Sequence, residues 1–188
     1  KRLDKMKNLW NQSDAAACNS ELDLRVYSSR LLGAAPSLVL HGGGNTSVKA
    51  EFTNVFSESV PALYVKGSGW DLRTIEAAGF PPVDLAYLQR LGALAELSDT
   101  DMMRQLRLAL LDPAGPTPSV EAILHAIIPC KYVDHTHADA VVTLSNTPDG
   151  TGLLQDLFGD EVLILPYTMP GFVLARQVAE ATLHVDWE

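Results

Sequence analysis

The order of hydrophobic and polar positions along the chain predicts strands and helices in alternation. Short apolar runs rich in Val, Leu and Thr favour strands over residues 37–40, 46–50, 62–66, 131–145 and 162–165. Other segments favour helices over residues 3–32, 83–97, 101–111, 119–128, 153–158 and 172–184. This alternation indicates an α/β fold in a single domain, and taken alone it favours a parallel sheet.

Turn-forming residues predict where two of these helices begin and end. The first helix is expected to end at Gly33. Thr117 and Pro118 favour a helix start, because Thr accepts bonds from free N–H groups and Pro fits the first helical position. Pro129 closes that helix. The helix and the strand that follows it are therefore expected to pack as neighbours.

His135 and His137 stand two residues apart in the predicted strand 131–145. Side chains at positions i and i+2 of a strand project from the same face, so both imidazoles are expected to point at one spot. Imidazole is a good ligand for Zn²⁺, and two converging rings form half of such a site. The same spacing is compatible with two histidines that face solvent or only satisfy local hydrogen bonds.

Glu121 and His125 lie on the predicted helix just before this strand. A carboxylate beside a divalent metal acts as a ligand or as a general base. The alternative for Glu121 is a solvent-exposed glutamate of a helix. His125 shares the face of Glu121, but its other helix neighbours are apolar. We therefore expect a core histidine there, with a third metal ligand as the alternative.

Two glycine-rich loops follow predicted strands and are of the kind that cradles anions. They are GGGNTS at residues 42–47 and KGSG at residues 66–69. Glycine lets the backbone approach a ligand closely and present its N–H groups, while Asn, Ser and Lys add side-chain donors. Neither loop has the spacing of a P-loop or of a dinucleotide site. Tight turns without a ligand are the alternative.

Composition and charge narrow the classes of function. The 188 residues are 47% hydrophobic and 20% charged, as in an ordinary globular protein. The net charge of −9, with 14 scattered Lys and Arg residues, argues against a nucleic-acid partner. No apolar run approaches the roughly 20 residues of a membrane span, and residues 1–12 do not resemble a signal peptide. Two distant cysteines, Cys18 and Cys130, fit the reducing cytoplasm.

Four motifs together resemble the class II, zinc-dependent aldolase/adducin family. They are HGGGNTSVK at 41–49, YVKGSGWDL at 64–72, PSVEAILHA at 118–126 and DHTHADAVVTLSNT at 134–147. The motifs stand in the family's order, and the resemblance runs from about Leu31 to the end of the chain. It is closest to the aldolase domain of the bifunctional rhamnulose-1-phosphate aldolase/alcohol dehydrogenases. The resemblance implies a central, mainly antiparallel sheet with helices on both faces.

The resemblance also implies roles for the candidate residues. His135 and His137 match the paired zinc ligands, and Glu121 matches the carboxylate that acts as acid and base beside the metal. The residues that match the pocket for the substrate phosphate are Asn45, Gly67, Ser68, Gly69 and Ser119. The implied reaction is reversible cleavage of a ketose 1-phosphate into dihydroxyacetone phosphate and an aldehyde, with zinc stabilising the enediolate. Because family members are commonly homotetramers, we expect a tetramer with sites completed across subunits.

Two departures from the family pattern leave alternatives open. The family's third zinc histidine follows residues 166–171 at a distance, and the chain is expected to stop at Glu188 just short of it. His184 is the only downstream candidate. Val120 stands where aldolases often have a second serine for phosphate. Since the family includes other activities, a sugar-phosphate dehydratase or epimerase and a non-catalytic adducin-like interaction module are the alternatives.

Overall fold

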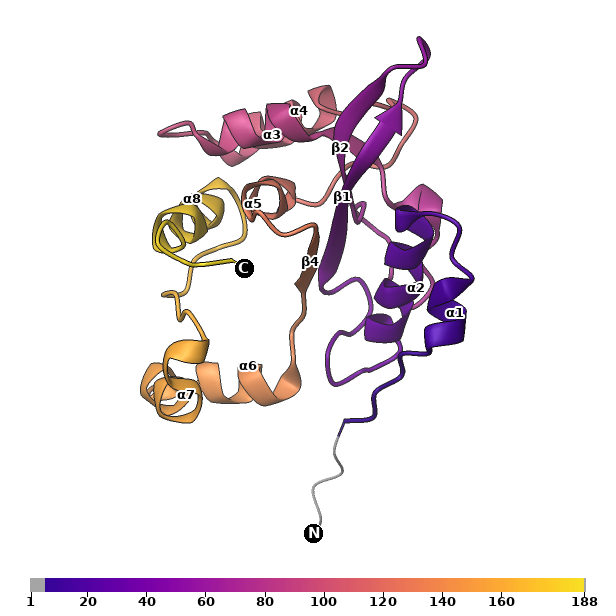
Figure 1. Cartoon of the computed structure of the whole chain (residues 1–188). Coiled ribbons are helices and arrows are strands. Elements are labelled where there is room, and N and C mark those ends of the chain that lie inside the picture. Colours follow the sequence, from indigo (N-terminus) through magenta and orange to yellow (C-terminus); the bar gives the residue numbers. More distant parts are fainter. Residues whose placement is uncertain (1–5, 188) are drawn as a thin grey trace.

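The computed structural model describes residues 6–187, and its centre is a four-stranded sheet (Figure 1). The strands are β1 (Asn45–Thr53), β2 (Ser59–Val65), β3 (Pro82–Asp84) and β4 (Tyr132–His135). Their order in the sheet is β3-β2-β1-β4, and each neighbouring pair is antiparallel. The antiparallel sheet implied by the family resemblance is therefore confirmed. The parallel sheet favoured by the alternation of elements alone is wrong.

Helices cover both faces of the sheet and make three layers with it (Figure 1). One face carries α2 (Glu21–Gly33), which the short helix α1 (Gln12–Ala16) precedes in the chain. The other face carries α3 (Leu85–Gly92), α4 (Asp99–Leu108), α5 (Ala122–Ile127) and α8 (Phe172–Ala181). This layered α/β architecture agrees with the expected fold.

Alternation along β2 divides its side chains between two hydrophobic clusters. Leu63 and Val65 are fully buried and belong to the cluster that includes residues of α3, α4, α5 and α8. Tyr64, between them in sequence, packs on the other cluster, whose buried members include Leu72 and Phe80. Since neighbouring residues of a strand point to opposite faces, one strand stabilises both layers.

Helix α2 is anchored to the sheet by the buried side chain of Arg25. Its Nη1 atom donates to the carbonyl oxygen of Ser47 at 3.3 Å and pairs with Asp134 Oδ1 at 2.7 Å. The guanidinium also lies 5.6 Å from the centre of the Tyr132 ring. A buried charge is tolerated when it is paired and hydrogen-bonded. Arg25 therefore ties α2 to β1 and β4 together.

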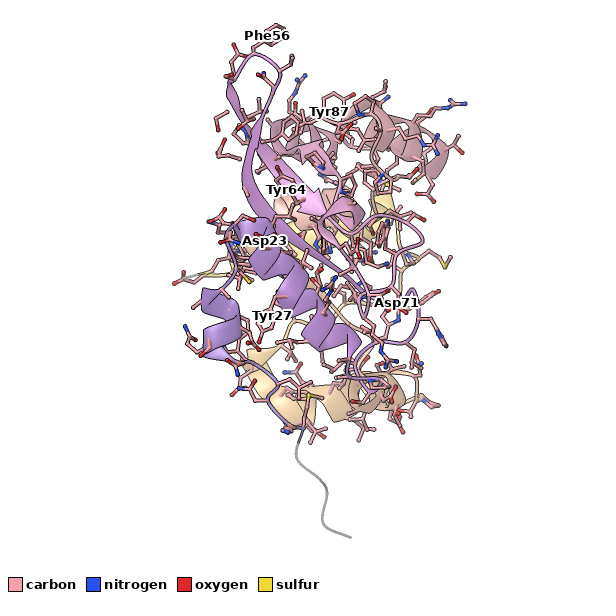
Figure 2. All side chains as sticks on the ribbon, turned by 90° about the vertical axis from the view of Figure 1, so that its right-hand side faces the viewer. Asp23, Tyr27, Phe56, Tyr64, Asp71 and Tyr87 are labelled. Atoms are coloured by element: carbon pink, nitrogen blue, oxygen red, sulfur yellow. The ribbon has the colours of Figure 1, made fainter. Side chains whose placement is uncertain are left out.

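The β1–β2 hairpin extends beyond the body of the molecule, and Figure 2 shows Phe56 at its tip. Asn54 holds the turn, because its Oδ1 atom accepts hydrogen bonds from the N–H groups of Phe56 and Glu58 at 2.9 and 3.0 Å. The Phe56 side chain is exposed. The shape of this turn therefore comes from local hydrogen bonds and not from burial.

Helices α6 (Asp139–Ser145) and α7 (Gly150–Phe158) pack against each other beyond the end of β4 (Figure 1). Short 3-10 helices span Ala77–Gly79 and Gly159–Glu161. Large apolar side chains of the α6–α7 region are exposed, namely Val141, Val142, Leu153, Leu157, Phe158, Val162 and Leu163. No helix among residues 6–187 is long and apolar enough to cross a membrane.

Three predicted strands are shorter or absent in the structure. Residues 37 and 38 form a turn, and residues 39–40 and 162–165 are irregular. The predicted strand 131–145 ends at His135, which pairs with Asn45 at the start of β1. Beyond that pair β4 has no partner on β1, and the apolar run that follows forms α6. A short apolar run cannot be assigned to a strand or a helix by its periodicity alone.

The predicted helices are all present, but most are shorter than expected. The helix predicted over 3–32 is divided into α1 and α2, which begin after the capping side chains of Asn11 and Ser20. Residues 3–5 of that prediction lie outside the described residues. The helix predicted over 83–97 begins after β3, where Asp84 accepts a hydrogen bond from the N–H group of Tyr87 at 2.9 Å. Capping side chains thus set boundaries that the apolar pattern left open.

Candidate active site

All eight residues assigned to a site from the sequence line one cavity of about 300 Å³. They are Asn45, Gly67, Ser68, Gly69, Ser119, Glu121, His135 and His137. The cavity forms where the loop before β1, the loop after β2, the start of α5 and the end of β4 meet. The structure brings these residues together from distant parts of the sequence, while their individual roles stay predictions.

A larger cavity of about 490 Å³ lies between residues 6–10 and α2. Its lining is mainly apolar, and its Arg25 and Asp134 side chains already form an ion pair with each other. We place the candidate site in the smaller cavity, because a carboxylate and two imidazoles converge there. Size alone does not identify a site that must exchange protons or bind a metal.

Strand pairing places Asn45 beside His135. The two residues face each other in the β1–β4 register, and Asn45 Nδ2 lies 3.2 Å from His135 Nδ1. Just before β1 the chain passes through Gly44, which has a φ of +66°. A Cβ atom at this position would lie 2.7 Å from the carbonyl oxygen of His135. Glycine is therefore required where this loop meets β4.

Glu121 is at the N-cap position of α5, but its side chain caps no backbone N–H group and lines the cavity instead. Its Oε2 atom lies 2.8 Å from His135 Nδ1 and accepts a hydrogen bond from Asn45 Nδ2. Burial raises the pKa of Glu121, but the hydrogen bonds from His135 and Asn45 and the charge of His135 outweigh it, and the pKa falls to about 2. The carboxylate is therefore ionised at neutral pH.

The helix that follows Glu121 begins later than the predicted start at residues 117–118. Pro118 forms an isolated bridge with Gly67. The N–H group of Ser119 donates to the carbonyl oxygen of Lys66 at 3.1 Å. These contacts hold the segment against the loop after β2, so it stays extended before α5 begins.

His137 lies beyond the end of β4, so alternation along a strand does not explain its position. Its backbone N–H group donates to the carbonyl oxygen of Leu38 at 2.8 Å. The ring centres of His135 and His137 are nevertheless 4.8 Å apart, with an angle of 58° between the ring planes. The two imidazoles do converge, because the carbonyl oxygens of Ser37 and Leu38 hold the chain after β4.

The side chains present fit part of the coordination sphere of a divalent metal. Zn²⁺ takes four ligands and accepts histidine nitrogen and carboxylate oxygen. Among residues 6–187, no group of three or more His, Cys, Asp and Glu side chains is arranged to hold a metal by itself. The buried Oδ1 atom of Asn45 has no hydrogen-bond partner in the described part of the chain. An unpaired polar atom in a cavity wall favours a bound ligand or water there.

The glycine loops offer fewer backbone donors to an anion than their sequences predict. Several of their N–H groups donate to carbonyl oxygens of the protein, among them Gly43 to Leu40 at 2.9 Å, Gly67 to Gly79 at 2.7 Å and Ser68 to Thr117 at 2.8 Å. These bonds fix the loops. These N–H groups are therefore not available to an anion in the cavity.

Lys66 is a charged donor of the cavity, and the sequence indicates it only as part of an anion-binding loop. Its Nζ atom donates to the carbonyl oxygen of Gly42 at 3.1 Å, and the residue is only 6% exposed. Burial lowers the pKa of Lys66. Met103 and Pro170 also line the cavity. No sequence signal points to them, since they come from α4 and from the loop before α8.

The two other candidate histidine ligands do not line the cavity. His125 is fully buried, and its Nδ1 atom lies 2.8 Å from the hydroxyl oxygen of Ser47. It is the core histidine that the apolar pattern predicted. His184 is exposed in the turn after α8. Neither side chain is placed to coordinate a metal together with His135 and His137.

Comparison with known proteins shows what the chain is similar to. The family model described as class II aldolase and adducin N-terminal domain matches residues 25–186. The chain is also similar to the solved N-terminal class II aldolase domain of a conserved protein from Thermoplasma acidophilum. That structure is 38% identical in sequence and superposes with a TM-score of 0.85, covering 94% of this chain and 80% of that one.

The chain is also similar to a curated protein that is named as an oxidoreductase, the uncharacterized oxidoreductase YuxG of Bacillus subtilis (strain 168). It is 34% identical over 175 residues, which cover 93% of this chain. The chain spans 25% of the length of YuxG. Neither named protein is described as a rhamnulose-1-phosphate aldolase, so that closer resemblance stays a prediction.

Proposed function

The chain belongs to the class II aldolase and adducin N-terminal domain family, and from that premise we propose that it is a metal-dependent aldolase. The proposed reaction is cleavage of a ketose 1-phosphate, such as rhamnulose 1-phosphate, into dihydroxyacetone phosphate and an aldehyde. One observation carries the proposal: the Glu121 carboxylate lies 2.8 Å from His135 Nδ1, in a cavity that His137 also lines. This arrangement combines a proton-transfer group with two metal-binding side chains.

His135 and His137 would hold the metal, which we propose to be Zn²⁺. Zn²⁺ bound there would act as a Lewis acid that stabilises negative charge on the substrate oxygens. The two imidazoles fill two ligand positions, and the remaining ligands would come from water, from the substrate or from residues outside this set. The short separation of the two rings, 4.8 Å between centres, supports their joint role.

Glu121 would move the proton that cleavage requires. In the cleavage direction the C4 hydroxyl loses a proton, the C3–C4 bond breaks, and C3 gains a proton, so one carboxylate can serve both transfers. The pKa of about 2 belongs to a carboxylate paired with His135, and such a carboxylate is a weak base. Because burial alone raises this pKa, Glu121 becomes a stronger base when it turns from His135 to the substrate.

The phosphate of the substrate would bind at the side of the cavity lined by Lys66, Ser68 and Ser119. The ammonium of Lys66 supplies charge, and the hydroxyl groups supply donors. Ser119 Oγ accepts the N–H group of Glu121 at 3.2 Å, which leaves its own hydrogen for a ligand. Val120 also lines the cavity and adds no donor, so the proposed phosphate site depends on fewer hydroxyl groups than in aldolases with a second serine.

Subunit association is proposed separately from the chemistry. The exposed apolar side chains of α6, α7 and the residues after them are of the kind that protein interfaces cover. We propose a homo-oligomer, with a tetramer as the expected state. Sedimentation that gave only monomer at micromolar concentration would contradict this assembly.

A substrate panel tests the proposed activity. The Zn²⁺-loaded protein is incubated with several ketose 1-phosphates, and dihydroxyacetone phosphate is measured with a coupled enzyme. Release of dihydroxyacetone phosphate that is lost in Glu121→Gln supports an aldolase. Loss of water or inversion at C4 without cleavage would instead identify a dehydratase or an epimerase. Inertness of the metal-loaded protein toward all substrates would favour a non-catalytic module.

A further inference from the structure

Alternate residues of β1 contact α5 in the same order along both elements. At the cavity end, Asn45 Nδ2 donates to the Glu121 carboxylate. Two residues further along β1, the hydroxyl oxygen of Ser47 lies 2.8 Å from His125 Nδ1. Two residues further again, Lys49 Nζ donates to the backbone carbonyl of His125 at 2.9 Å. These three residues share one face of the strand, so they form a polar ladder between β1 and α5.

The spacings of the strand and of the helix nearly match along this ladder. Two residues of a strand advance by roughly 6.6 Å, and the four residues from Glu121 to His125 advance by about 6 Å along a helix. Both side-chain contacts can therefore form together in one register. A shift of α5 by one residue along β1 would break them together, because each pairs one atom with one partner.

Lys49 is the residue of the ladder that lies furthest from the cavity. Besides the carbonyl of His125, its Nζ atom donates to the carbonyl oxygens of Ile128 at 2.6 Å and Cys130 at 2.7 Å. An ammonium has three N–H donors, and all three are used here. The last carbonyls of a helix lack intrahelical partners and favour a cation. Lys49 therefore fixes the end of α5 and the turn that leads from α5 to β4.

We propose that Lys49 is a positioning residue that sets where α5 lies along β1 and therefore how far the Glu121 carboxylate is from His135. Its side chain does not line the cavity and is not a catalytic residue. It acts at the opposite end of α5 from Glu121, through the backbone carbonyls of the helix and of the turn. The effect on catalysis rests on the proposed role of Glu121. The position of α5 along β1 can be measured without an assay of enzymatic activity.

Four variants, one of them a control, test the proposal in the whole chain. Lys49→Met keeps an unbranched side chain but removes all three donors, and Lys49→Arg keeps the charge and several donors. Lys7→Met is the matched control, since Lys7 is exposed and lies outside α5, and its substitution removes the same charge. Ser47→Ala removes the neighbouring contact of the ladder and leaves Lys49 in place.

The first measurement follows the ring nitrogens of His135 and His125 by ¹H–¹⁵N correlation spectra of the metal-free protein. We expect Lys49→Met and Ser47→Ala to shift the signals of both rings, with Lys49→Arg nearer to wild type and Lys7→Met unchanged. Unchanged His135 signals in Lys49→Met and Ser47→Ala would overturn the proposal. If circular dichroism shows Lys49→Met to be unfolded, Lys49→Gln, which keeps two N–H donors, is measured in its place with the same two outcomes.

The second measurement separates kcat from KM in the Zn²⁺-loaded protein. Small displacements of catalytic groups can reduce rates by up to about 100-fold. We expect kcat of Lys49→Met to fall roughly 10- to 100-fold with little change in KM, and Lys49→Arg to recover most of the loss. If the His135 signals shift but the wild-type protein cleaves no substrate, the role of Lys49 in positioning α5 is supported and the proposed aldolase activity is rejected. A wild-type kcat in Lys49→Met would overturn the positioning role.

Discussion

The Glu121 carboxylate and the His135 imidazole meet at 2.8 Å although they lie on opposite ends of a helix–turn–strand unit. Glu121 precedes α5, and His135 ends β4 after the turn at residues 128–131. The turn brings the chain back, so that the last residue of β4 lies beside the residue that precedes α5. The proton-transfer group and the metal-binding group of the proposed site are therefore held by one short segment.

Glu121→Gln should separate catalysis from metal binding. The amide keeps the size of the carboxylate and one acceptor oxygen but cannot take up a proton. General acid–base groups typically contribute about 10²–10⁴ in rate, so kcat for ketose 1-phosphate cleavage should fall by that factor. Metal content, measured by atomic emission on the same preparation, should stay near the wild-type value. A variant with most of its kcat would deprive the proposed mechanism of its base.

His137→Ala should lose metal and activity together. Removing one of two imidazoles halves the histidine donors of the proposed site, so Zn²⁺ affinity should fall by at least about 10-fold. Titration with Zn²⁺ in a calorimeter measures this directly. His184→Ala is the matched control, because His184 is exposed and lies outside the cavity. Undiminished metal binding by His137→Ala would contradict the assignment of this ligand.

Gly44→Ala should destabilise the loop beside His135. The residue has a φ of +66°, and a new Cβ atom would lie 2.6 Å from Val39 Cγ1 and 2.7 Å from the His135 carbonyl oxygen. Backbone strain of this kind costs about 1–3 kcal/mol, and the contacts add to it. Gly42→Ala is the control, since a Cβ atom there meets no heavy atom within 4 Å. Urea unfolding curves of both variants compare the two free energies of unfolding.

Much of this arrangement can be predicted from the sequence, and the remainder depends on tertiary contacts. The motifs around Glu121 and His135 indicated the right neighbours, because the helix–turn–strand unit is local. The apolar pattern predicts His137 within the strand, but its position depends on the bond from its N–H group to Leu38, which is distant in sequence. The ladder from Lys49 was not predicted, since no local pattern states which carbonyl oxygens a lysine will reach.

Resemblance to a family and periodicity contributed differently. Periodicity located β1 and β2 but favoured the wrong sheet, because alternation of elements does not specify strand direction. It also extended the His135 strand through the apolar run that forms α6. The family resemblance gave the antiparallel sheet and the set of cavity residues. It gave no reason for the burial of Arg25, which depends on pairing with Asp134 on β4.

His125 should make the stability of the protein fall in mildly acidic solution. The ring is fully buried, and its burial, which disfavours the charged form, lowers the pKa of His125 from 6.5 to about 3. Between these two values the unfolded chain binds a proton that the folded chain does not. The free energy of unfolding is therefore fully retained above pH 6.5 and decreases as the pH falls toward 3.

Comparison of wild type with His125→Leu isolates this effect from the carboxylates, which titrate in both proteins. Urea unfolding is measured at pH 7, 6, 5 and 4. We expect wild type to lose roughly 3 kcal/mol more than the variant between pH 7 and pH 4, following the linkage between protonation and folding. The absolute stability of His125→Leu at pH 7 also reflects the lost contact with Ser47, so only the difference in slope is interpreted. Parallel pH profiles would mean that the folded protein can accommodate a charged His125 ring.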